Sequence, residues 1–194
     1  MKLAILDRDG TLNALGDGFI ATPADWTPVP GALEAVARLN QAGWHVVLAT
    51  NQPGLGRGLF DAQALVAIHA KMHRQLATVG GRIDAVFYCP HAEGEACNCR
   101  KPAPGLMEQI CQRYGVEGSE ILVVGSCPAH LQAAADLGAQ LHMVCTGRSA
   151  HLDPREPLPP GWPAGTRAHA SLGALADFIA PPDDAGLPVV ATGG

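Results

Sequence analysis

Two carboxylates near the start of the chain have the spacing that phosphoryl transfer could use. Asp7 and Asp9 belong to the run Asp-Arg-Asp-Gly-Thr, 7–11, which directly follows the short apolar run 2–6. In doubly wound α/β proteins the carboxyl end of such a strand lies beside the ligand. A carboxylate can attack phosphorus to form an aspartyl-phosphate, and a second acid nearby can protonate the leaving oxygen. The alternative is an acidic turn with no chemical role.

A second set of candidate ligands lies in the middle of the chain, within the loop 89–101. Three thiolates and one imidazole complete the tetrahedral shell that Zn²⁺ prefers, so the pattern predicts a structural zinc rather than a catalytic one with an open position. The loop ends at Arg100 and Lys101, which the metal would help to position. A disulfide and unliganded thiols are the alternatives. The predicted zinc ligands are Cys89, His91, Cys97 and Cys99.

Length and composition are those of a globular protein. The 194 residues suit a single domain, which we expect over 1–180, followed by a disordered tail over 181–194. A net charge of -5 argues against a general nucleic-acid binder. No apolar run approaches the roughly 18 residues of a membrane span, and residues 1–2 lead into a strand rather than a signal peptide. We therefore expect a cytoplasmic protein that binds neither nucleic acid nor membrane.

Short apolar runs alternate with helical patterns along the chain. This alternation indicates a Rossmann-like, doubly wound α/β fold with a mainly parallel sheet covered on both faces. Asp61 is the expected N-cap of the second helix, and the segment 153–165, rich in proline and glycine, is expected to be a loop. Strands are expected at 2–6, 44–50, 84–88, 120–125 and 140–145, and helices at 31–43, 61–81, 105–115, 131–137 and 171–180.

In this order of elements the sequence resembles the haloacid dehalogenase-like phosphohydrolases. The likeness rests on the first acidic motif, on Thr50 at the end of the second strand, and on Lys101 before a later helix. It implies that Asp7 is the nucleophile, that Asp9 is the general acid and base, and that Thr50 and Lys101 hold the phosphoryl group. It also implies a catalytic Mg²⁺ bound by the Asp7 carboxylate and the Asp9 carbonyl.

Two further stretches narrow the resemblance within that family. The run Thr-Asn-Gln-Pro-Gly-Leu-Gly-Arg-Gly, 50–58, and the cysteine-rich loop are similar to a branch that removes the 7-phosphate of a heptose bisphosphate. Its neighbours act on histidinol phosphate, which stays an alternative substrate, as do other phosphate monoesters. The likeness covers roughly 1–150 and implies a monomer without a large cap domain, working toward nucleotide-activated heptose for lipopolysaccharide. The substrate-binding residues it implies are Asn51, Gln52, Arg57 and Arg100.

The resemblance fails at the family's fourth motif, a strand that ends in Gly-Asp with another acid a few residues later. Ser126 stands where that Asp would ligate Mg²⁺, Cys127 stands where this branch usually has Lys, and His130 stands where the later acid would be. Asp136 cannot substitute, because ten helical residues at about 1.5 Å each place it on the order of 12 Å or more away.

Three interpretations of this departure stay open. Because Mg²⁺ often needs only one or two carboxylates plus the substrate phosphate, the protein could be a phosphatase with weakened Mg²⁺ affinity. It could instead bind a sugar phosphate, as a regulatory or divergent protein, and barely turn it over. In the third, Cys127 and His130 recruit a softer metal. More simply, His130 would be a solvated helix residue and Cys127 a small buried one, while His69 and His73 would lie on the surface.

Overall fold

In the computed structural model, which describes residues 1–181, six parallel strands form one sheet in the order β3-β2-β1-β4-β5-β6. The predicted α/β fold is confirmed, and each of the five predicted strands lies within one residue of its expected bounds. The sixth, at the sheet edge, was not predicted. The strands are β1 (Leu3–Leu6), β2 (His45–Asn51), β3 (Ala85–Cys89), β4 (Ile121–Gly125), β5 (Gln140–Val144) and β6 (Arg167–His169).

The chain changes direction across the sheet at β1. It runs from β1 outward through β2 to β3, and then returns to β4 on the other side of β1 and continues outward to β6. The last residue of β1, Leu6, pairs with Leu48 on one side and with Val124 on the other. Such a switch point opens a crevice at the carboxyl ends of the two central strands. The first acidic motif emerges from β1 at this crevice.

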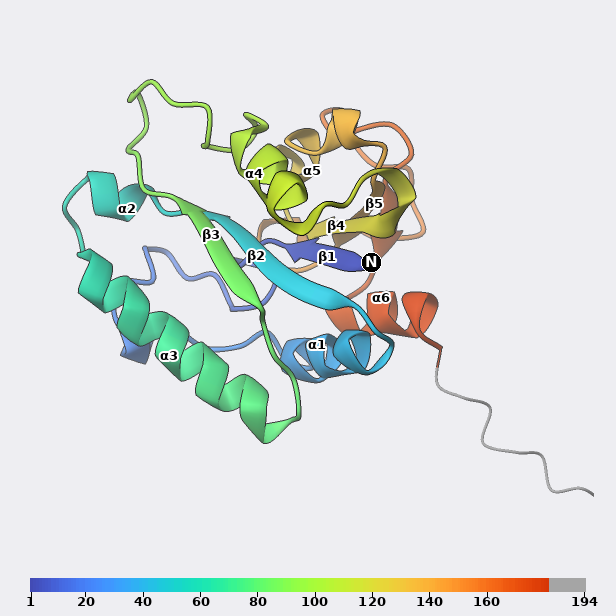
Figure 1. The fold of residues 1–194 in the computed structure, drawn as a ribbon, viewed down its shortest axis with the longest axis horizontal. Coiled ribbons are helices and arrows are strands. Elements are labelled where there is room, and N and C mark those ends of the chain that lie inside the picture. Colours follow the sequence, from blue (N-terminus) through green and yellow to red (C-terminus); the bar gives the residue numbers. More distant parts are fainter. Residues whose placement is uncertain (182–194) are drawn as a thin grey trace, which may run out of the picture.

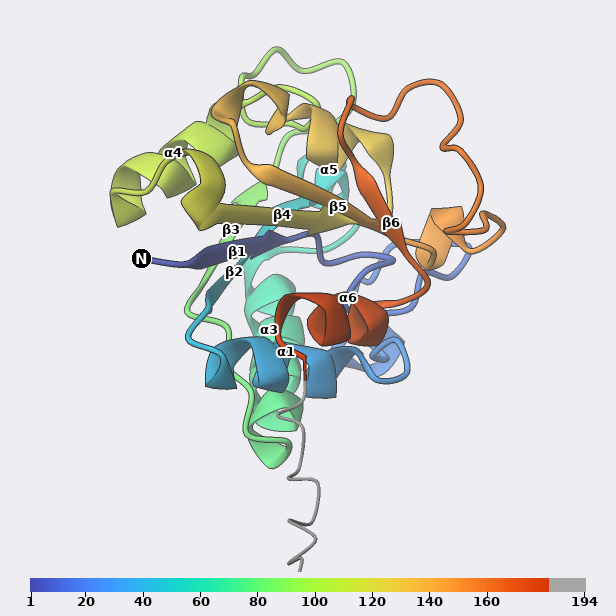
Figure 2. The same cartoon turned by 90° about the vertical axis from the view of Figure 1, so that its right-hand side faces the viewer.

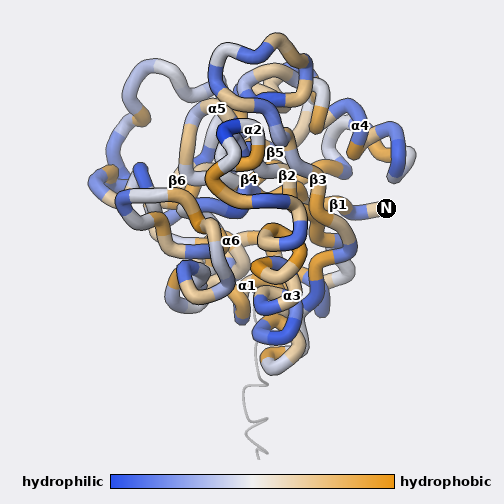
Figure 3. The backbone as a smooth tube through the Cα atoms, turned by 90° about the vertical axis from the view of Figure 1, so that its left-hand side faces the viewer, coloured by the Kyte–Doolittle hydropathy of each residue, from blue (hydrophilic) through white to orange (hydrophobic). Residues whose placement is uncertain are grey.

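Helices cover both faces of the sheet, as Figures 1 and 2 show. Helices α1 (Ala32–Gln41), α3 (Ala62–Thr78) and α6 (Leu172–Ile179) pack on one face, and α4 (Gly105–Tyr114) and α5 (Pro128–Gln132) on the other. Each face has its own buried apolar cluster, because alternate residues of a strand point to opposite faces. Figure 3 shows this as apolar strands inside a more polar periphery. Within the described residues, no large cap domain covers the crevice.

Local sequence explains several element ends. Asp61 caps α3 as predicted, since its carboxylate accepts a 2.8 Å hydrogen bond from the backbone N–H of Ala64. The predicted helix over 131–137 is wrong in part, because α5 ends at Gln132 and a separate 3₁₀ turn follows. Short elements complete the fold: α2 (Pro53–Gly56) and the 3₁₀ turns η1 (Pro23–Asp25), η2 (Gly118–Glu120), η3 (Ala135–Leu137) and η4 (Gly147–Ser149).

Two further predictions concern membrane-spanning helices and the C-terminal tail. Among residues 1–181, none of the helices has the length and apolar character needed to cross a bilayer. The tail expected to be disordered, 181–194, falls outside the described residues from 182 onward.

Candidate active site

Asp7 leaves the sheet where β1 ends against β4. Its backbone N–H donates to the carbonyl of Val124 at 2.9 Å, which continues the strand pairing by one residue and fixes the start of the turn. Oδ1 accepts hydrogen bonds from Lys101 Nζ at 2.9 Å and from the backbone N–H of Arg8 at 2.8 Å. Among the described residues Oδ2 has one partner, the weakly donating thiol of Cys127 at 3.5 Å. One oxygen of Asp7 is therefore held firmly while the other can meet a ligand.

Lys101 is held from three sides. Its Nζ donates to Asp7 Oδ1, to the carbonyl of Ala49 at 2.7 Å and to Nδ1 of His130 at 3.0 Å, which uses all three ammonium protons. Nε2 of His130 lies 3.2 Å from the carbonyl oxygen of Ile5. Because a carbonyl only accepts, Nε2 carries the proton and Nδ1 is free to accept from Lys101. The ammonium is thus a fixed positive charge beside Asp7.

The pKa values of these groups follow from burial and from their neighbours. Burial is the largest single influence on the pKa of Asp7 and raises it, but the charge of Lys101, the neighbouring His130 and the hydrogen bonds from Lys101 and Arg8 together bring the pKa below the ordinary value of 3.8. Burial, and then the charge of Lys101, lowers the pKa of His130 to about 3. Burial, and then the charge of Asp7, raises the pKa of Cys127 to about 11. At neutral pH the site therefore holds an ionised carboxylate, a neutral imidazole and a neutral thiol.

The second acid, Asp9, is held at both carboxylate oxygens. Arg8 Nε donates to Oδ1 at 2.9 Å and Gln52 Nε2 donates to Oδ2 at 3.0 Å. The Arg8 side chain is fully buried, and its Nη1 lies 3.1 Å from Nε2 of His69 on α3. Burial and the charge of Arg8 lower the pKa of His69 to about 4, so the neutral ring accepts from the guanidinium. The expected surface position is wrong for the half-buried His69, whereas His73 is exposed.

Thr50 and Asn51 end β2 beside the two acids. The Thr50 hydroxyl accepts from Gln52 Nε2 at 2.9 Å, while within residues 1–181 its own proton has only a long 3.5 Å contact with the Asn51 carbonyl. That proton is available to a bound anion. The Asn51 side chain clamps the backbone of Lys101, donating to its carbonyl at 3.0 Å and accepting from its N–H at 3.0 Å. Asn51 and Gln52 thus hold other site residues in place, and Asn51 also faces the cavity described below.

The residues that replace the fourth motif lie between β4 and the first turn of α5. The buried Ser126 accepts a 3.1 Å hydrogen bond at Oγ from Thr11 Oγ1, and its carbonyl accepts from Ser149 Oγ at 2.7 Å. Cys127, expected to be buried, is only half-buried and lines the same cavity as the two acids. A neutral hydroxyl and a neutral thiol therefore stand where two charged side chains were expected from the resemblance.

The position of His130 bears on two expectations. The side chain is fully buried rather than solvated, and each ring nitrogen has a hydrogen-bond partner in the protein. With Nδ1 taken by Lys101 and Nε2 by Ile5, the ring has no nitrogen left for a metal. These contacts favour the other two interpretations over the one in which Cys127 and His130 recruit a softer metal.

A cavity of about 920 Å³ lies over these groups, and both acids line it. Arg100 lines it too, but its guanidinium donates to the carbonyls of Ala92 and Glu95 in the cysteine-rich loop. Arg57 is not among the lining residues, and its guanidinium lies 5.4 Å from the ring centroid of Phe19. The two arginines implied as substrate contacts are therefore engaged with other parts of the protein.

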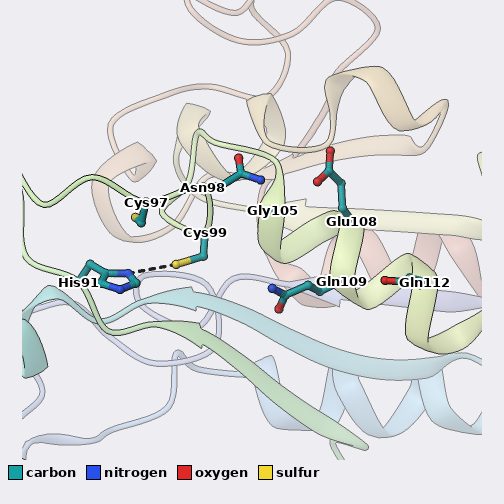
Figure 4. A pocket seen from close by; sticks show the side chains of 8 residues that line it. All are labelled: His91, Cys97, Asn98, Cys99, Gly105, Glu108, Gln109 and Gln112. Atoms are coloured by element: carbon teal, nitrogen blue, oxygen red, sulfur yellow. Dashed lines mark hydrogen bonds between the residues drawn. The ribbon is translucent and has the colours of Figure 1, made fainter.

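The four predicted zinc ligands come together in the loop that follows β3. Their ligand atoms all lie within 4.8 Å of one another, with Cys89 Sγ 3.8 Å from Cys97 Sγ and His91 Nδ1 3.2 Å from Cys99 Sγ. Figure 4 shows His91 and Cys99 turned toward each other at one side of a smaller cavity. All six cysteines of the chain lie in its described part and are free thiols, so the disulfide alternative is wrong.

These four ligand atoms fit a zinc ion. A tetrahedral ion with Zn–S bonds of about 2.3 Å separates its sulfur ligands by about 3.8 Å, and a shorter Zn–N bond brings nitrogen and sulfur somewhat closer. The distances in the cluster match this pattern. The cluster lies just before Lys101, so a bound ion would brace the loop that delivers the site's ammonium group.

Comparison with known proteins places this geometry in a family. The family model described as haloacid dehalogenase-like hydrolase matches residues 14–138. A D-glycero-beta-D-manno-heptose-1,7-bisphosphate 7-phosphatase of Bordetella bronchiseptica is 49% identical over 180 residues, covering 92% of this chain and 98% of that protein. The chain belongs to the haloacid dehalogenase-like hydrolases. Another heptose-bisphosphate 7-phosphatase, from Pseudomonas aeruginosa, is 44% identical over 82% of this chain and 89% of its own length.

Solved structures of this hydrolase family agree with the fold. A D,D-heptose 1,7-bisphosphate phosphatase from B. bronchiseptica, complexed with magnesium and phosphate, superposes with a TM-score of 0.84 at 48% identity, covering 92% of this chain and 98% of that chain. The corresponding enzyme of Burkholderia thailandensis has a TM-score of 0.70 at 44% identity, covering 92% and 99%. The resemblance to the haloacid dehalogenase-like hydrolases, which rests on the acidic, threonine and lysine motifs, is therefore confirmed.

The oxygen atoms of this hydrolase's site fit a magnesium ion. These ligands carry less negative charge than the resemblance implies. Candidate ligands are the Asp7 carboxylate, the hydroxyl of Ser126 and the carbonyl of Asp9, which accepts no hydrogen bond among the described residues. Mg²⁺ takes oxygen ligands and usually keeps several waters, with one or two carboxylates and substrate phosphate completing its shell. One carboxylate in place of two satisfies this requirement at its lower limit.

Proposed function

We propose that this protein removes the 7-phosphate of D-glycero-D-manno-heptose 1,7-bisphosphate through an aspartyl-phosphate intermediate. The observation that carries the proposal is the Asp7 carboxylate, ionised and held by Lys101 at 2.9 Å at the bottom of a cavity large enough for a sugar phosphate. The similarity to heptose-bisphosphate phosphatases over 92% of the chain supports the choice of substrate.

In the first half-reaction an oxygen of Asp7 attacks phosphorus as the bond from phosphorus to the sugar oxygen breaks. Thr50 donates its hydroxyl proton to a phosphoryl oxygen, and the charge of Lys101 stabilises the negative charge shared by nucleophile and phosphate. Asp9 gives a proton to the leaving sugar oxygen. Arg8 and Gln52 hold the Asp9 carboxyl group in place for this transfer.

In the second half-reaction Asp9, now a carboxylate, takes a proton from a water molecule that attacks the phosphorus of the aspartyl-phosphate. The bond from phosphorus to Asp7 breaks, inorganic phosphate leaves, and the nucleophile is regenerated. Because the pKa of Asp7 lies below 3.8, the carboxylate is a good leaving group and returns to its ionised form at neutral pH.

The proposal includes a binding site for each of two metal ions. Asp7, the Asp9 carbonyl and Ser126 would hold Mg²⁺, which when bound neutralises charge on the phosphoryl group. Cys89, His91, Cys97 and Cys99 would hold a structural Zn²⁺. We further propose that the protein acts as a cytoplasmic monomer on a small sugar phosphate.

Phosphorus NMR of the reaction tests the proposed function. With heptose 1,7-bisphosphate, we expect the 7-phosphate resonance to disappear and the inorganic phosphate signal to grow while the 1-phosphate resonance persists. Histidinol phosphate is the comparison substrate and should be hydrolysed much more slowly. Faster hydrolysis of histidinol phosphate, or loss of the 1-phosphate first, would overturn the assignment of substrate.

One observation favours a second candidate, a protein that binds the sugar phosphate but turns it over weakly. Ser126 offers a neutral hydroxyl where the resemblance implies a metal-binding acid, and it is already bonded to Thr11 at 3.1 Å. Dependence of the rate on Mg²⁺ separates the two candidates. Stimulation by Mg²⁺ supports the phosphatase, and tight substrate binding without any Mg²⁺ effect on rate supports the weakly active binder.

A further inference from the structure

A wall of the active-site cavity comes from a segment that the family motifs do not include. Beyond the motif residues, the cavity is lined by Arg148, His151, Leu152 and Trp162, which lie in the connection between β5 and β6. Sequence patterns identified part of this connection only as a loop. Figure 2 shows the connection, in orange, extending past the carboxyl end of β5 on the side of the sheet edge. Its residues therefore form part of the wall of the active-site cavity.

The start of this connection is tied to the catalytic turn. The Thr146 hydroxyl donates to the carbonyl of Gly10 at 2.7 Å, and Ser149 Oγ donates to the carbonyl of Ser126 at 2.7 Å. Between them, Gly147 packs so closely on Gly10 that a Cβ atom on it would lie 2.5 Å from the Gly10 Cα. The backbone on both sides of Arg148 is therefore fixed against the two motifs that surround the reacting phosphate.

Among the lysine and arginine side chains that line the cavity, that of Arg148 has N–H donors without a partner in residues 1–181. Lys101 uses all three of its N–H groups within the protein, and the guanidinium of Arg100 is bonded to loop carbonyls. Within residues 1–181, Arg148 has neither a hydrogen bond nor an ion pair through its side chain, and the side chain is exposed. A guanidinium with free donors matches the geometry of a phosphate group.

The cavity also has room for a second phosphate. At about 920 Å³ it falls at the upper end of the range for small-molecule sites, whereas a phosphoryl group attacked by Asp7 would occupy only the part next to that residue. Trp162 and Leu152, in the same connection, give the cavity wall an apolar surface that a sugar carbon chain can contact. A ligand with two phosphates would thus find a free cation in the same cavity as the nucleophile.

We propose that Arg148 binds the phosphate that the reaction leaves on the sugar, and that it makes the protein selective for bisphosphorylated over monophosphorylated substrates. This inference rests on the proposed function, since it takes the reacting phosphate to be the one beside Asp7. It assigns the second phosphate to the connection between β5 and β6 rather than to Arg57 or to the cysteine-rich loop.

Binding measured without turnover tests this proposal. In the Asp7→Asn background, calorimetry gives the dissociation constants of heptose 1,7-bisphosphate and of heptose 7-phosphate, which lacks the second phosphate. Adding Arg148→Gln should weaken bisphosphate binding roughly 10- to 100-fold, the usual effect of losing a charge-assisted contact, and leave heptose 7-phosphate almost unchanged. The matched control is Arg155→Gln, in the same connection, where the arginine is exposed and pairs with Asp153. It should change neither constant.

The possible results separate the two proposals. Equal weakening of both ligands, or no effect on either, would overturn the role of Arg148. If the bisphosphate binds with the expected dependence on Arg148 but the parent protein releases no phosphate from it, the subsite stands and the proposed function falls. If the protein binds neither ligand, both fall.

Discussion

Lys101 Nζ donates a 3.0 Å hydrogen bond to Nδ1 of His130, a neutral ring in a position where the family resemblance implies an acid. If an acid stood there, the single positive charge of Lys101 would have to balance two carboxylates. The imidazole accepts the hydrogen bond without adding negative charge, so the ammonium is left to balance Asp7 alone. This arrangement suits a site that has also lost the negative charge of the metal-binding acid at Ser126.

The buried neutral ring of His130 predicts a loss of stability in acid. Its pKa is about 3 in the folded protein and about 6.5 in the unfolded chain, which therefore binds the extra proton as pH falls from about 6.5 toward 3. Stability from this residue is complete above 6.5 and declines below it. Between pH 7 and pH 5 the decline should be about 2 kcal/mol, measured as the free energy of unfolding in urea.

His130→Gln should remove that part of the acid sensitivity, because glutamine does not titrate. The parent's drop in unfolding free energy between pH 7 and pH 5 should shrink by about 2 kcal/mol in the variant. What remains comes from other histidines, since burial also lowers the pKa values of His69 and His142 to about 4. His151→Gln, on an exposed loop, is the control. An equal drop in parent and His130→Gln would contradict the neutral, buried assignment.

Restoring an acid at the end of β4 should strengthen the magnesium site. Ser126→Asp adds a second carboxylate beside Asp7, and we expect half-maximal activity at an Mg²⁺ concentration lower by roughly tenfold or more. The control is Ser119→Asp, because Ser119 is exposed in η2, at the opposite end of β4 from Ser126. An unchanged magnesium dependence in Ser126→Asp would mean that the missing acid does not limit metal binding.

Gln52 is predicted to be a positioning residue for Asp9 and Thr50. It donates to both side chains, at 3.0 Å and 2.9 Å, and Gln52→Leu removes both hydrogen bonds while keeping the side-chain size. We expect kcat to fall about tenfold with little change in KM, because the general acid loses its orientation rather than the substrate its contacts. The exposed Gln63 on α3 offers a matched Gln63→Leu control. A rise in KM at constant kcat would instead favour direct substrate binding by Gln52.

The cysteine cluster predicts one bound zinc per chain. Cys97→Ser should abolish most zinc binding, measured by metal analysis of the purified protein, and lower the melting temperature because the loop before Lys101 loses its brace. Cys111→Ser changes a half-buried thiol outside the cluster and should retain the metal. Full zinc content in Cys97→Ser, or equal loss in both variants, would exclude the four-ligand site.

The elements that the sequence predicts correctly are those with strong local patterns. Strands β1, β2 and β4 are almost continuous apolar runs, since both of their faces are buried. Strand β6 carries no such signal, because it is three residues long and lies at the sheet edge with Arg167 at its start. Over 133–137 the alanine-rich sequence favours a helix, so local propensity does not account for the end of α5 at Gln132.

Site residues follow the same division. Asp7, Thr50 and Lys101 are recognisable because each follows or precedes a predictable element, and parallel strands bring their carboxyl ends to one edge. The burial of Arg8 and its contact with His69 depend on the packing of α3 against the sheet, 61 residues along the chain. In the sequence, the only indication that Arg8 has a structural role is its position between the two acids of the first motif.

The most direct test of the account is phosphate release from heptose 1,7-bisphosphate across a magnesium titration, with the parent protein and Asp7→Asn side by side. We predict release by the parent that saturates only at high Mg²⁺. In Asp7→Asn we predict a loss of roughly 10⁴-fold or more, with unchanged zinc content and fold. Residual activity of Asp7→Asn near that of the parent would contradict the nucleophile assignment. No release by the parent at any Mg²⁺ concentration, with the sugar still bound, would contradict the account of this chain as a working phosphatase.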